Sequence, residues 1–141
     1  MKIVIRINIV AFLYTLNPEH FLLLKRSQNR GGFWQPVSGG VEKCEQPIQS
    51  VKREIFEETG IKDIIRIVDL DSSYDYECMK NNVKMRMKDI CYGVELDKIE
   101  PVILSEEHSM FKWCKKDKVR DYLNWKEILV SFEKLNKIIN L

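Results

Sequence analysis

Three glutamates, Glu54, Glu57 and Glu58, occur within five consecutive residues of this 141-residue chain. If the segment is a helix, residues three and four positions apart share a face, and the three carboxylates lie within an arc of roughly 100°. Carboxylate oxygens are the ligands that Mg²⁺ and Mn²⁺ prefer. The spacing therefore predicts either a site for a hard divalent cation or a solvated acidic face whose partners are Lys52 and Arg53.

The segment that must position these glutamates has the features of a helix over residues 46–59, about four turns long. Pro47 is tolerated in a first helical turn, and we expect it to mark the start of the helix. Gly60 stands where a helix C-cap glycine is expected. The residues that form a separate apolar arc, and that we expect to face a core, are Ile48, Val51 and Ile55.

The helix is part of a longer pattern with fixed spacing. The chain has Gly39, five further residues, Glu45, seven further residues, and then the run Arg53-Glu54-Ile55-Phe56-Glu57-Glu58-Thr59-Gly60-Ile61. This run matches every defined position of the Nudix box, so the chain resembles the Nudix hydrolase family. The resemblance implies an α/β/α sandwich with a mixed β-sheet, in which the box forms a loop–helix–loop.

The resemblance also implies a role for each residue of the box. The three helix glutamates would bind the catalytic metal ions, which are Mg²⁺ or alternatively Mn²⁺. The carbonyl group of Gly39 would be a further metal ligand. Glu45 and Arg53 would be structural and would pair to hold the loop against the helix, so that Glu45 stays outside the first metal shell.

Two segments outside the box resemble one branch of the family. The run Trp34-Gln35-Pro36-Val37-Ser38-Gly39-Gly40 is similar to the branch of dihydroneopterin triphosphate pyrophosphatases and deoxyadenosine triphosphate pyrophosphohydrolases. The run from Glu107 to Trp113 is similar to a stretch in which a glutamate outside the box reaches the metal site. That similarity implies the role for Glu107, with Glu106 as the alternative. We expect His108 to be structural rather than a general base.

Three residues before the box are candidates for contact with a substrate. Arg26 follows an apolar run, and the family often has a basic residue near the phosphates at this place; the alternative is a solvated charge at a strand end. Phe33 is a candidate for lining a pocket. Trp34 is a candidate for stacking on a base, but a tryptophan at a strand end is more often part of the core, and we favour the core.

Composition sets broad limits on function and location. The chain has 31% charged and 45% hydrophobic residues, as globular proteins do, and its length predicts one domain over residues 1–141. A net charge of +2 does not by itself predict polyanion binding, and we expect no DNA partner. The four cysteines lack Cys-x-x-Cys or zinc-like spacing, and neither a signal peptide nor an apolar membrane span is visible. We therefore expect free thiols in a reducing cytoplasm.

Hydrophobic periodicity predicts the remaining elements. Alternating or apolar runs indicate strands, and Asn81-Asn82 indicates a hairpin turn. A repeat of apolar residues at helical spacing predicts a closing amphipathic helix. The predicted strands are 2–14, 20–27, one or two within 62–78, 83–94 and 109–114, and the closing helix is 125–139. Together with the box helix, these elements predict an α/β fold with a mixed sheet.

The expected activity is Mg²⁺-dependent hydrolysis of a nucleoside or pterin triphosphate to a monophosphate and pyrophosphate, by a monomer or homodimer. Glu107 and Glu57 are the candidates for the carboxylate that takes the proton from the attacking water. The alternatives within enzymes are a diadenosine tetraphosphate hydrolase and an RNA 5′-pyrophosphohydrolase. A non-catalytic module that binds a nucleotide is a further alternative, and the complete set of box residues counts against it.

Overall fold

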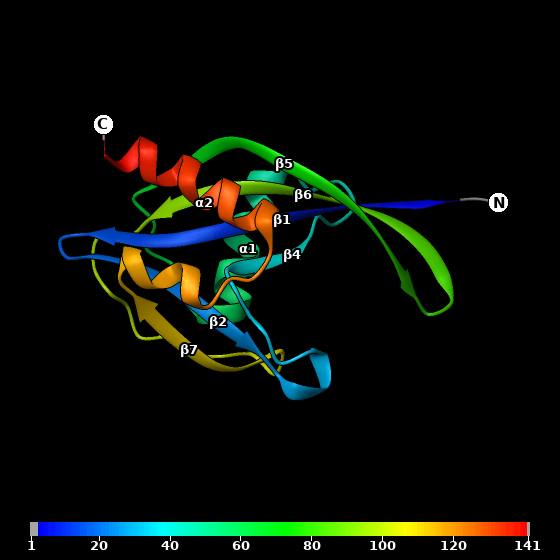
Figure 1. Cartoon of the computed structure of the whole chain (residues 1–141), viewed down its shortest axis with the longest axis horizontal. Coiled ribbons are helices and arrows are strands. Elements are labelled where there is room, and N and C mark those ends of the chain that lie inside the picture. Colours follow the sequence, from blue (N-terminus) through cyan, green and yellow to red (C-terminus); the bar gives the residue numbers. More distant parts are fainter. Residues whose placement is uncertain (1–2, 141) are drawn as a thin grey trace.

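Strand β1 (Val4–Leu16) runs through the centre of the computed structural model, which describes residues 3–140 (Figure 1). Successive side chains of a strand point to opposite faces of the sheet. In the middle of β1 this alternation separates two apolar clusters, because Ile9, Ala11 and Leu13 belong to one and Val10, Phe12 and Tyr14 to the other. A strand that is apolar on both faces requires a cover on each face.

The sheet around β1 is mixed, as predicted. One edge of β1 pairs in parallel with β6 (Val83–Glu95), which pairs antiparallel with β5 (Arg66–Lys80). The other edge pairs antiparallel first with β4 (Val37–Gly40) and then with β2 (Glu19–Arg26). Strand β2 also pairs with two further strands, β3 (Trp34–Gln35) and β7 (His108–Cys114).

Two helices cover the two faces of the sheet. Helix α1 (Pro47–Thr59) buries Val51 and Ile55 in one apolar cluster. Helix α2 (Lys126–Ile139) buries Ile128, Phe132 and Leu135 in the other. Short 3₁₀ segments, η1 (Gln28–Arg30) and η2 (Lys116–Asp121), follow β2 and β7. The predicted α/β/α arrangement is confirmed, and the box helix ends at Thr59 as predicted but begins at Pro47, one residue after the predicted start.

The prediction for Ile48 is wrong, because its side chain is 48% exposed. The buried arc of α1 contains Glu54 and Glu58 as well as Val51 and Ile55, so its centre is rotated toward the glutamates. Ile48 therefore lies at the margin of that arc, on the side of the helix that is exposed. The helix thus places carboxylates where a purely structural helix would place apolar side chains.

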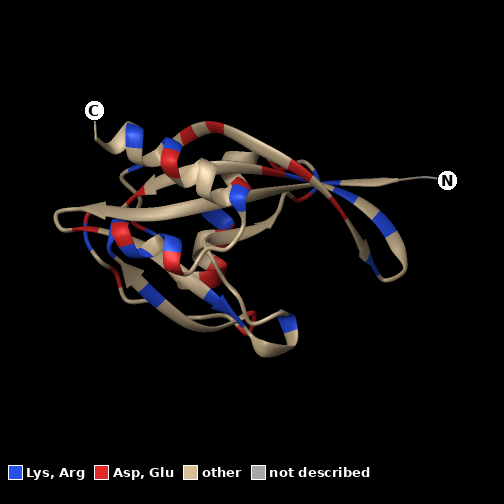
Figure 2. Cartoon of the chain, viewed as in Figure 1, with Lys and Arg blue, Asp and Glu red and all other residues tan. Residues whose placement is uncertain are grey.

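Strands β5 and β6 continue beyond the body of the molecule as a two-stranded arm beside the N-terminal part of β1 (Figure 1). The arm ends at Asn81 and Asn82, whose φ angles of 52° and 63° confirm the predicted hairpin turn. On β6 the basic residues of the arm, Lys84, Arg86 and Lys88, alternate with apolar ones, and acidic residues lie on β5 (Figure 2). Glu77 faces Lys84 and Arg86 at 3.4 Å from each, so the charges of the arm are partly neutralised within it.

The state of the cysteines and the length of the helices complete the description of the fold. All four cysteines are free thiols, and two of them, Cys91 and Cys114, are buried in the apolar cluster under α2. Neither α1 nor α2, nor any other helix within residues 3–140, has the length and hydropathy that crossing a membrane requires.

Candidate active site

Helix α1 turns two of its three glutamates into the protein. Glu54 is 8% exposed and Glu58 is 2% exposed, whereas Glu57 is exposed. Burial raises the pKa of Glu58 to about 10, and the negative charge of Glu54 adds to this shift. Neither carboxylate oxygen of Glu58 has a hydrogen-bond partner among the described residues. A buried carboxylate without partners is costly, so this site favours a positively charged ligand.

Gly39 lets the backbone of β4 approach the carboxylate of Glu54. A Cβ atom at this position would lie 2.1 Å from the carboxyl carbon of Glu54, closer than real side chains come. Gly39 is opposite Ile9 of β1 in the antiparallel pair, and this pairing fixes its position. The residue type at position 39 is therefore set by the close packing of backbone against carboxylate.

The guanidinium group of Arg53 connects the loop before α1 to the helix. It donates from Nε to Glu45 at 2.8 Å, from Nη2 to the carbonyl of Gly40 at 2.7 Å, and from Nη1 to Glu54 at 2.8 Å. Nη1 also lies 3.2 Å from a carboxylate oxygen of Glu57. The hydrogen bond from Arg53 is the main reason that the pKa of Glu45 is lowered to about 2. Arg53 thus fixes the orientation of Glu54 relative to the loop.

The start of β7 brings two more side chains to Glu58. Ligand atoms of Glu58, Glu107 and His108 lie within 4.8 Å of one another, and Glu106 is not part of this group within residues 3–140. Burial lowers the pKa of His108 to about 4, so the ring is neutral. The side-chain amide of Gln35 donates to Nε2 of His108 at 3.0 Å, so the ring carries its proton on Nδ1, which lies 3.5 Å from Glu58.

These carboxylates form a continuous acidic cluster that fits a hard divalent cation. The charge of Glu57 raises the pKa of Glu54. Burial is the largest cause of the raised pKa of Glu58, and the charges of Glu54 and Glu107 add to it. The candidate ligand atoms are carboxylate oxygens, and the two oxygens of Glu58 have no hydrogen-bond partner among the described residues. The cluster therefore has the chemistry of a Mg²⁺ or Mn²⁺ site.

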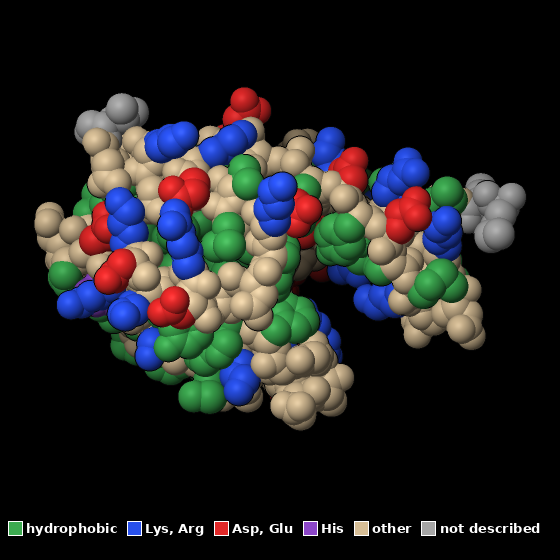
Figure 3. Space-filling model, viewed as in Figure 1, with side chains coloured by type: hydrophobic (Ala, Val, Ile, Leu, Met, Phe, Trp, Pro, Cys, Tyr) green, Lys and Arg blue, Asp and Glu red, His purple; other side chains and the backbone are tan. Residues whose placement is uncertain are grey.

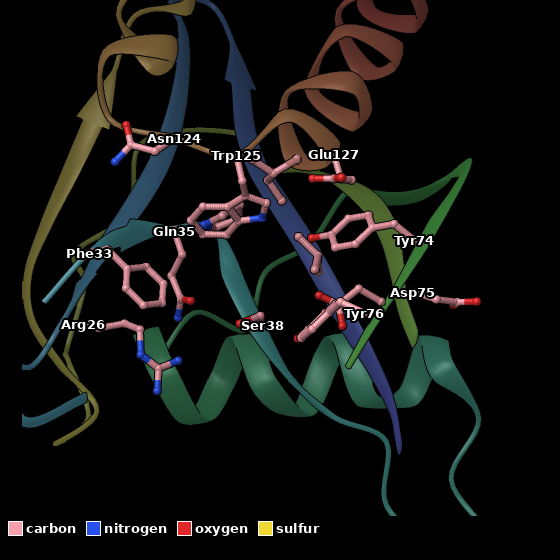
Figure 4. Close-up of a pocket in the computed structure, with 14 residues that line it drawn as sticks. Arg26, Phe33, Gln35, Ser38, Tyr74, Asp75, Tyr76, Asn124, Trp125 and Glu127 are labelled. Atoms are coloured by element: carbon pink, nitrogen blue, oxygen red, sulfur yellow. The ribbon is translucent and has the colours of Figure 1, made fainter. Parts of the chain in front are cut away.

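A cavity of about 620 Å³ lies beside the acidic cluster, and Figure 3 shows a hollow between the arm and the body. Its size is in the range of small-molecule sites, about 300–1,000 Å³. Aromatic rings from three segments line it (Figure 4), and Phe33 and Trp125 meet edge to face at 5.5 Å. Tyr74 and Tyr76 supply the other rings, and the polar lining residues include Arg26, Gln35, Ser38 and Asp89.

Two residues join the cavity to the acidic cluster. Gln35 lines the cavity and hydrogen bonds to His108, which faces Glu58. Arg26 also lines the cavity, with its guanidinium 5.4 Å from the centre of the Phe33 ring. Burial raises the pKa of Glu58, and the nearby charge of Arg26 opposes that shift. A ligand in the cavity would therefore extend toward the carboxylates past a cation.

The structure separates the three candidates for contact with a substrate. Arg26 and Phe33 line the cavity, but Trp34 does not. Trp34 and Gln35 are neighbours on β3 and point to opposite sides, so that only Gln35 reaches the cavity. The indole of Trp34 packs against the core under α2, with its ring 5.3 Å from that of Tyr122. This position agrees with the core location that the sequence favoured.

Sequence reasoning did not find Tyr74, Tyr76, Asp89 or Trp125. Asp89 could have been noticed, because an acidic residue directly precedes the apolar run from Ile90 to Val94 within a predicted strand. The tyrosines and the tryptophan gave no such signal, because aromatic residues in strands and at helix starts are usually part of a core.

The chain is similar to known proteins over most of its length. The family model described as NUDIX domain matches residues 6–133. The nucleoside triphosphatase NudI of Klebsiella pneumoniae is 30% identical over 117 residues, which cover 75% of this chain and 80% of that protein. An octanoyltransferase of Myxococcus xanthus is 34% identical over 105 residues, covering 74% of this chain. The chain spans only 29% of the length of that relative.

A solved structure has the same fold over the whole chain. The dihydroneopterin triphosphate pyrophosphohydrolase of E. coli superposes with a TM-score of 0.77, covering 99% of both chains at 20% sequence identity. At this identity the likeness shows the fold alone, so the substrate must be argued from the site.

Proposed function

Since the chain belongs to the NUDIX family, whose domain matches residues 6–133, we propose that it is a Mg²⁺-dependent pyrophosphohydrolase acting on a nucleoside or pterin triphosphate. The products would be the monophosphate and pyrophosphate. The observation that supports this reaction best is the continuity of the aromatic cavity with the acidic cluster, through Gln35 and Arg26. A ring in the cavity would direct its phosphates toward the carboxylates.

The residues that would hold the metal ions are Glu54, Glu58 and Glu107, with Glu57 at the exposed edge and the carbonyl of Gly39 as a further ligand. Bound Mg²⁺, or Mn²⁺ in its place, neutralises charge on phosphate oxygens and lowers the pKa of a coordinated water. The unpartnered oxygens of Glu58 support this assignment, because a dication is the ligand that best compensates their burial.

The remaining steps belong to side chains of this protein. Phe33 and Trp125 would hold the ring, and Arg26 would contact the phosphates from the cavity side. Water attacks a phosphorus atom, the bond from that phosphorus to the bridging oxygen breaks, and pyrophosphate leaves. Glu107 or Glu57, both exposed at the edge of the cluster, would take the proton from the attacking water. Fixing the ring and phosphates in one geometry lowers the barrier further.

We propose that the protein acts on a small-molecule substrate, has no DNA partner and is cytoplasmic. We propose a monomer or a homodimer.

The test is incubation of the purified protein with Mg²⁺ and a panel of triphosphates, followed by chromatography of the products. The panel contains ribonucleotides, deoxynucleotides, dihydroneopterin triphosphate, diadenosine tetraphosphate and a 5′-triphosphorylated RNA. Monophosphate and pyrophosphate from one triphosphate would support the proposal. ATP from the dinucleotide alone, or pyrophosphate from RNA alone, would move the protein to the corresponding alternative.

A matched variant makes the metal assignment testable. Glu54→Gln preserves shape and removes the negative charge, so activity should fall by orders of magnitude while the circular dichroism spectrum and the melting behaviour stay those of a folded protein. Near-normal turnover in this variant would contradict the metal assignment. If the unaltered protein turns over nothing, a nucleotide-binding module becomes the better reading.

A further inference from the structure

Asp89 lies in the wall of the aromatic cavity, on the central strand pair of the sheet. It is opposite Asn8 of β1 and opposite Tyr74 of β5, so these three side chains occupy matching positions on adjacent strands. Asp89 is only 8% exposed, yet it is among the residues that line the cavity. The small part of Asp89 that is exposed therefore faces the cavity, where we have proposed that a ring binds.

The side chains that act directly on Asp89, those of Asn8, Tyr74 and Tyr76, are polar and uncharged. Asn8 donates from Nδ2 to Oδ1 of Asp89 at 2.9 Å. Burial raises the pKa of Asp89, and the hydrogen bond from Asn8 and the nearby hydroxyl groups of Tyr74 and Tyr76 oppose that shift. No basic side chain among the described residues contributes to it. A buried acceptor of this kind gains most from a ligand that donates hydrogen bonds.

The walls around Asp89 suit a flat heterocycle. Tyr74 and Tyr76 have ring centres 6.3 Å apart on one side, and Phe33 and Trp125 meet edge to face on the other. In Figure 4 these four aromatic side chains surround one space, which extends toward Arg26. A planar ring would have aromatic contacts on its faces and a carboxylate at its edge.

We propose that Asp89 reads the edge of the substrate ring, and that the cavity takes a heterocycle with a 2-amino-4-oxopyrimidine edge, such as guanine or a pterin. This inference rests on the proposed function and narrows its substrate class. That edge presents an imino N–H next to an amino group, and a carboxylate accepts from two such donors in parallel. Adenine and cytosine present one amino group beside an acceptor nitrogen, which faces the carboxylate unfavourably.

The decisive comparison uses two substrates that differ by one group. Deoxyguanosine triphosphate has the 2-amino group and deoxyinosine triphosphate lacks it, while sugar, phosphates and the rest of the ring are the same. We expect kcat/KM for the guanine nucleotide to be at least about tenfold higher, because the inosine leaves one acceptor of a buried carboxylate unpaired. Equal values, or a best substrate with an adenine ring, would overturn the assignment.

Asp89→Asn tests the residue itself. The amide keeps the shape and can still accept from Asn8, but it replaces one acceptor with a donor. The ratio of kcat/KM between the two nucleotides should fall toward one, mainly through KM for the guanine substrate. Asp97→Asn, in an exposed loop after β6, makes the same change of charge away from the cavity and should leave the ratio unchanged. An unchanged ratio in Asp89→Asn would overturn the proposal.

Two further measurements separate the pterin from guanine, and the role of Asp89 from the proposed reaction. Turnover of dihydroneopterin triphosphate compared with deoxyguanosine triphosphate decides between the pterin and guanine as sources of the same edge. If no triphosphate is hydrolysed, the proposed function fails, and equilibrium binding of dGMP and dIMP then tests Asp89 separately. Preferential binding of dGMP would support the reading of the ring, and equal binding would overturn it. If Asp89→Asn does not fold, the comparison of substrates in the unaltered protein decides alone.

Discussion

Nδ1 of His108 lies 3.5 Å from Oε1 of Glu58, and the two side chains are 1% and 3% exposed. The other ring nitrogen of His108 accepts from Gln35, which lines the cavity. A neutral histidine that is held on one side and faces a carboxylate on the other restricts where that carboxylate can move. The contact therefore connects the cavity to the acidic cluster through a positioning residue rather than through a proton donor.

Replacing His108 should weaken metal binding and leave the lining of the cavity in place. In His108→Ala, Glu58 loses its neighbour and Gln35 loses its acceptor, so we expect activity to fall about 10- to 100-fold, as for partners of metal ligands in general. The Mg²⁺ concentration for half-maximal activity should rise, and His108→Asn, which restores a donor near the Nδ1 position, should recover part of the loss.

The control for this experiment is the other histidine of the chain. His20 lies on β2 at the end away from the acidic cluster, opposite Thr15 of β1. His20→Ala should leave the Mg²⁺ dependence unchanged. If His108→Ala shows the same Mg²⁺ dependence as the unaltered protein, His108 does not position Glu58.

Glu58 should make the metal-free protein less stable as the pH rises. Its pKa is raised from 4.5 to about 10 in the folded state, so the folded protein binds this proton more tightly than the unfolded chain does. The stability that the proton contributes is present below the unfolded pKa and is lost as the pH rises toward the folded pKa. In a chelator, the melting temperature should fall between about pH 6 and about pH 9.

Glu58→Gln supplies the comparison. The amide has no proton to lose, so the fall in melting temperature with pH should become smaller in the variant. Mg²⁺ should raise the melting temperature of the unaltered protein at neutral pH, because a ligand that binds only the folded state stabilises it, and it should do so less in the variant. Identical pH profiles for the two proteins would show that Glu58 is not the titrating group.

The sequence predicted what depends on neighbours along the chain. The alternation in β1, the helix from Pro47 to Thr59 and the turn at Asn81-Asn82 each follow from a local pattern, and each agrees with the structure. The spacing of the glutamates also identified the face that carries them. What it did not reveal is that Glu54 and Glu58 are buried while Glu57 is exposed, and that Ile48 lies at the exposed margin of the buried arc.

The cavity could not be predicted because strand pairing brings its residues together. Asn8 and Asp89 are 81 positions apart in the chain, and they become neighbours only through the parallel register of β1 with β6. No local pattern fixes that register. The difference between Phe33 and Trp34 likewise depends on which face of the sheet is covered by α2, and a pair of adjacent aromatic residues does not reveal it.

A methyl group at position 39 should displace the carboxylate of Glu54. The Cβ of Gly39→Ala would lie 2.1 Å from the carboxyl carbon of that side chain, which is buried and tied to Arg53. We expect a folded protein whose activity is at least about 100-fold lower, since misplacing a group by about 1 Å can cost that much.

Gly40→Ala is the matched control, because the three atoms nearest to the added Cβ all belong to the guanidinium of Arg6, the first at 2.4 Å. Arg6 is a long side chain that can rotate away, so the loss of activity should be much smaller than at position 39. Equal losses in the two variants would show that the loop, rather than the packing against Glu54, sets the requirement for glycine.

Phe33 and Trp34 are adjacent, and replacing each by alanine should have opposite consequences. Phe33 is 39% exposed and lines the cavity, so Phe33→Ala should raise KM with little change in melting temperature. Trp34 packs against Tyr122 and the core, so Trp34→Ala should lower the free energy of unfolding by about 2–3 kcal/mol and leave KM near its original value. Denaturant unfolding and steady-state kinetics on both variants measure the two effects. If Trp34→Ala raises KM while Phe33→Ala destabilises the fold, the two side chains have exchanged roles, and the ring-binding wall assigned to Phe33 and Trp125 is wrong.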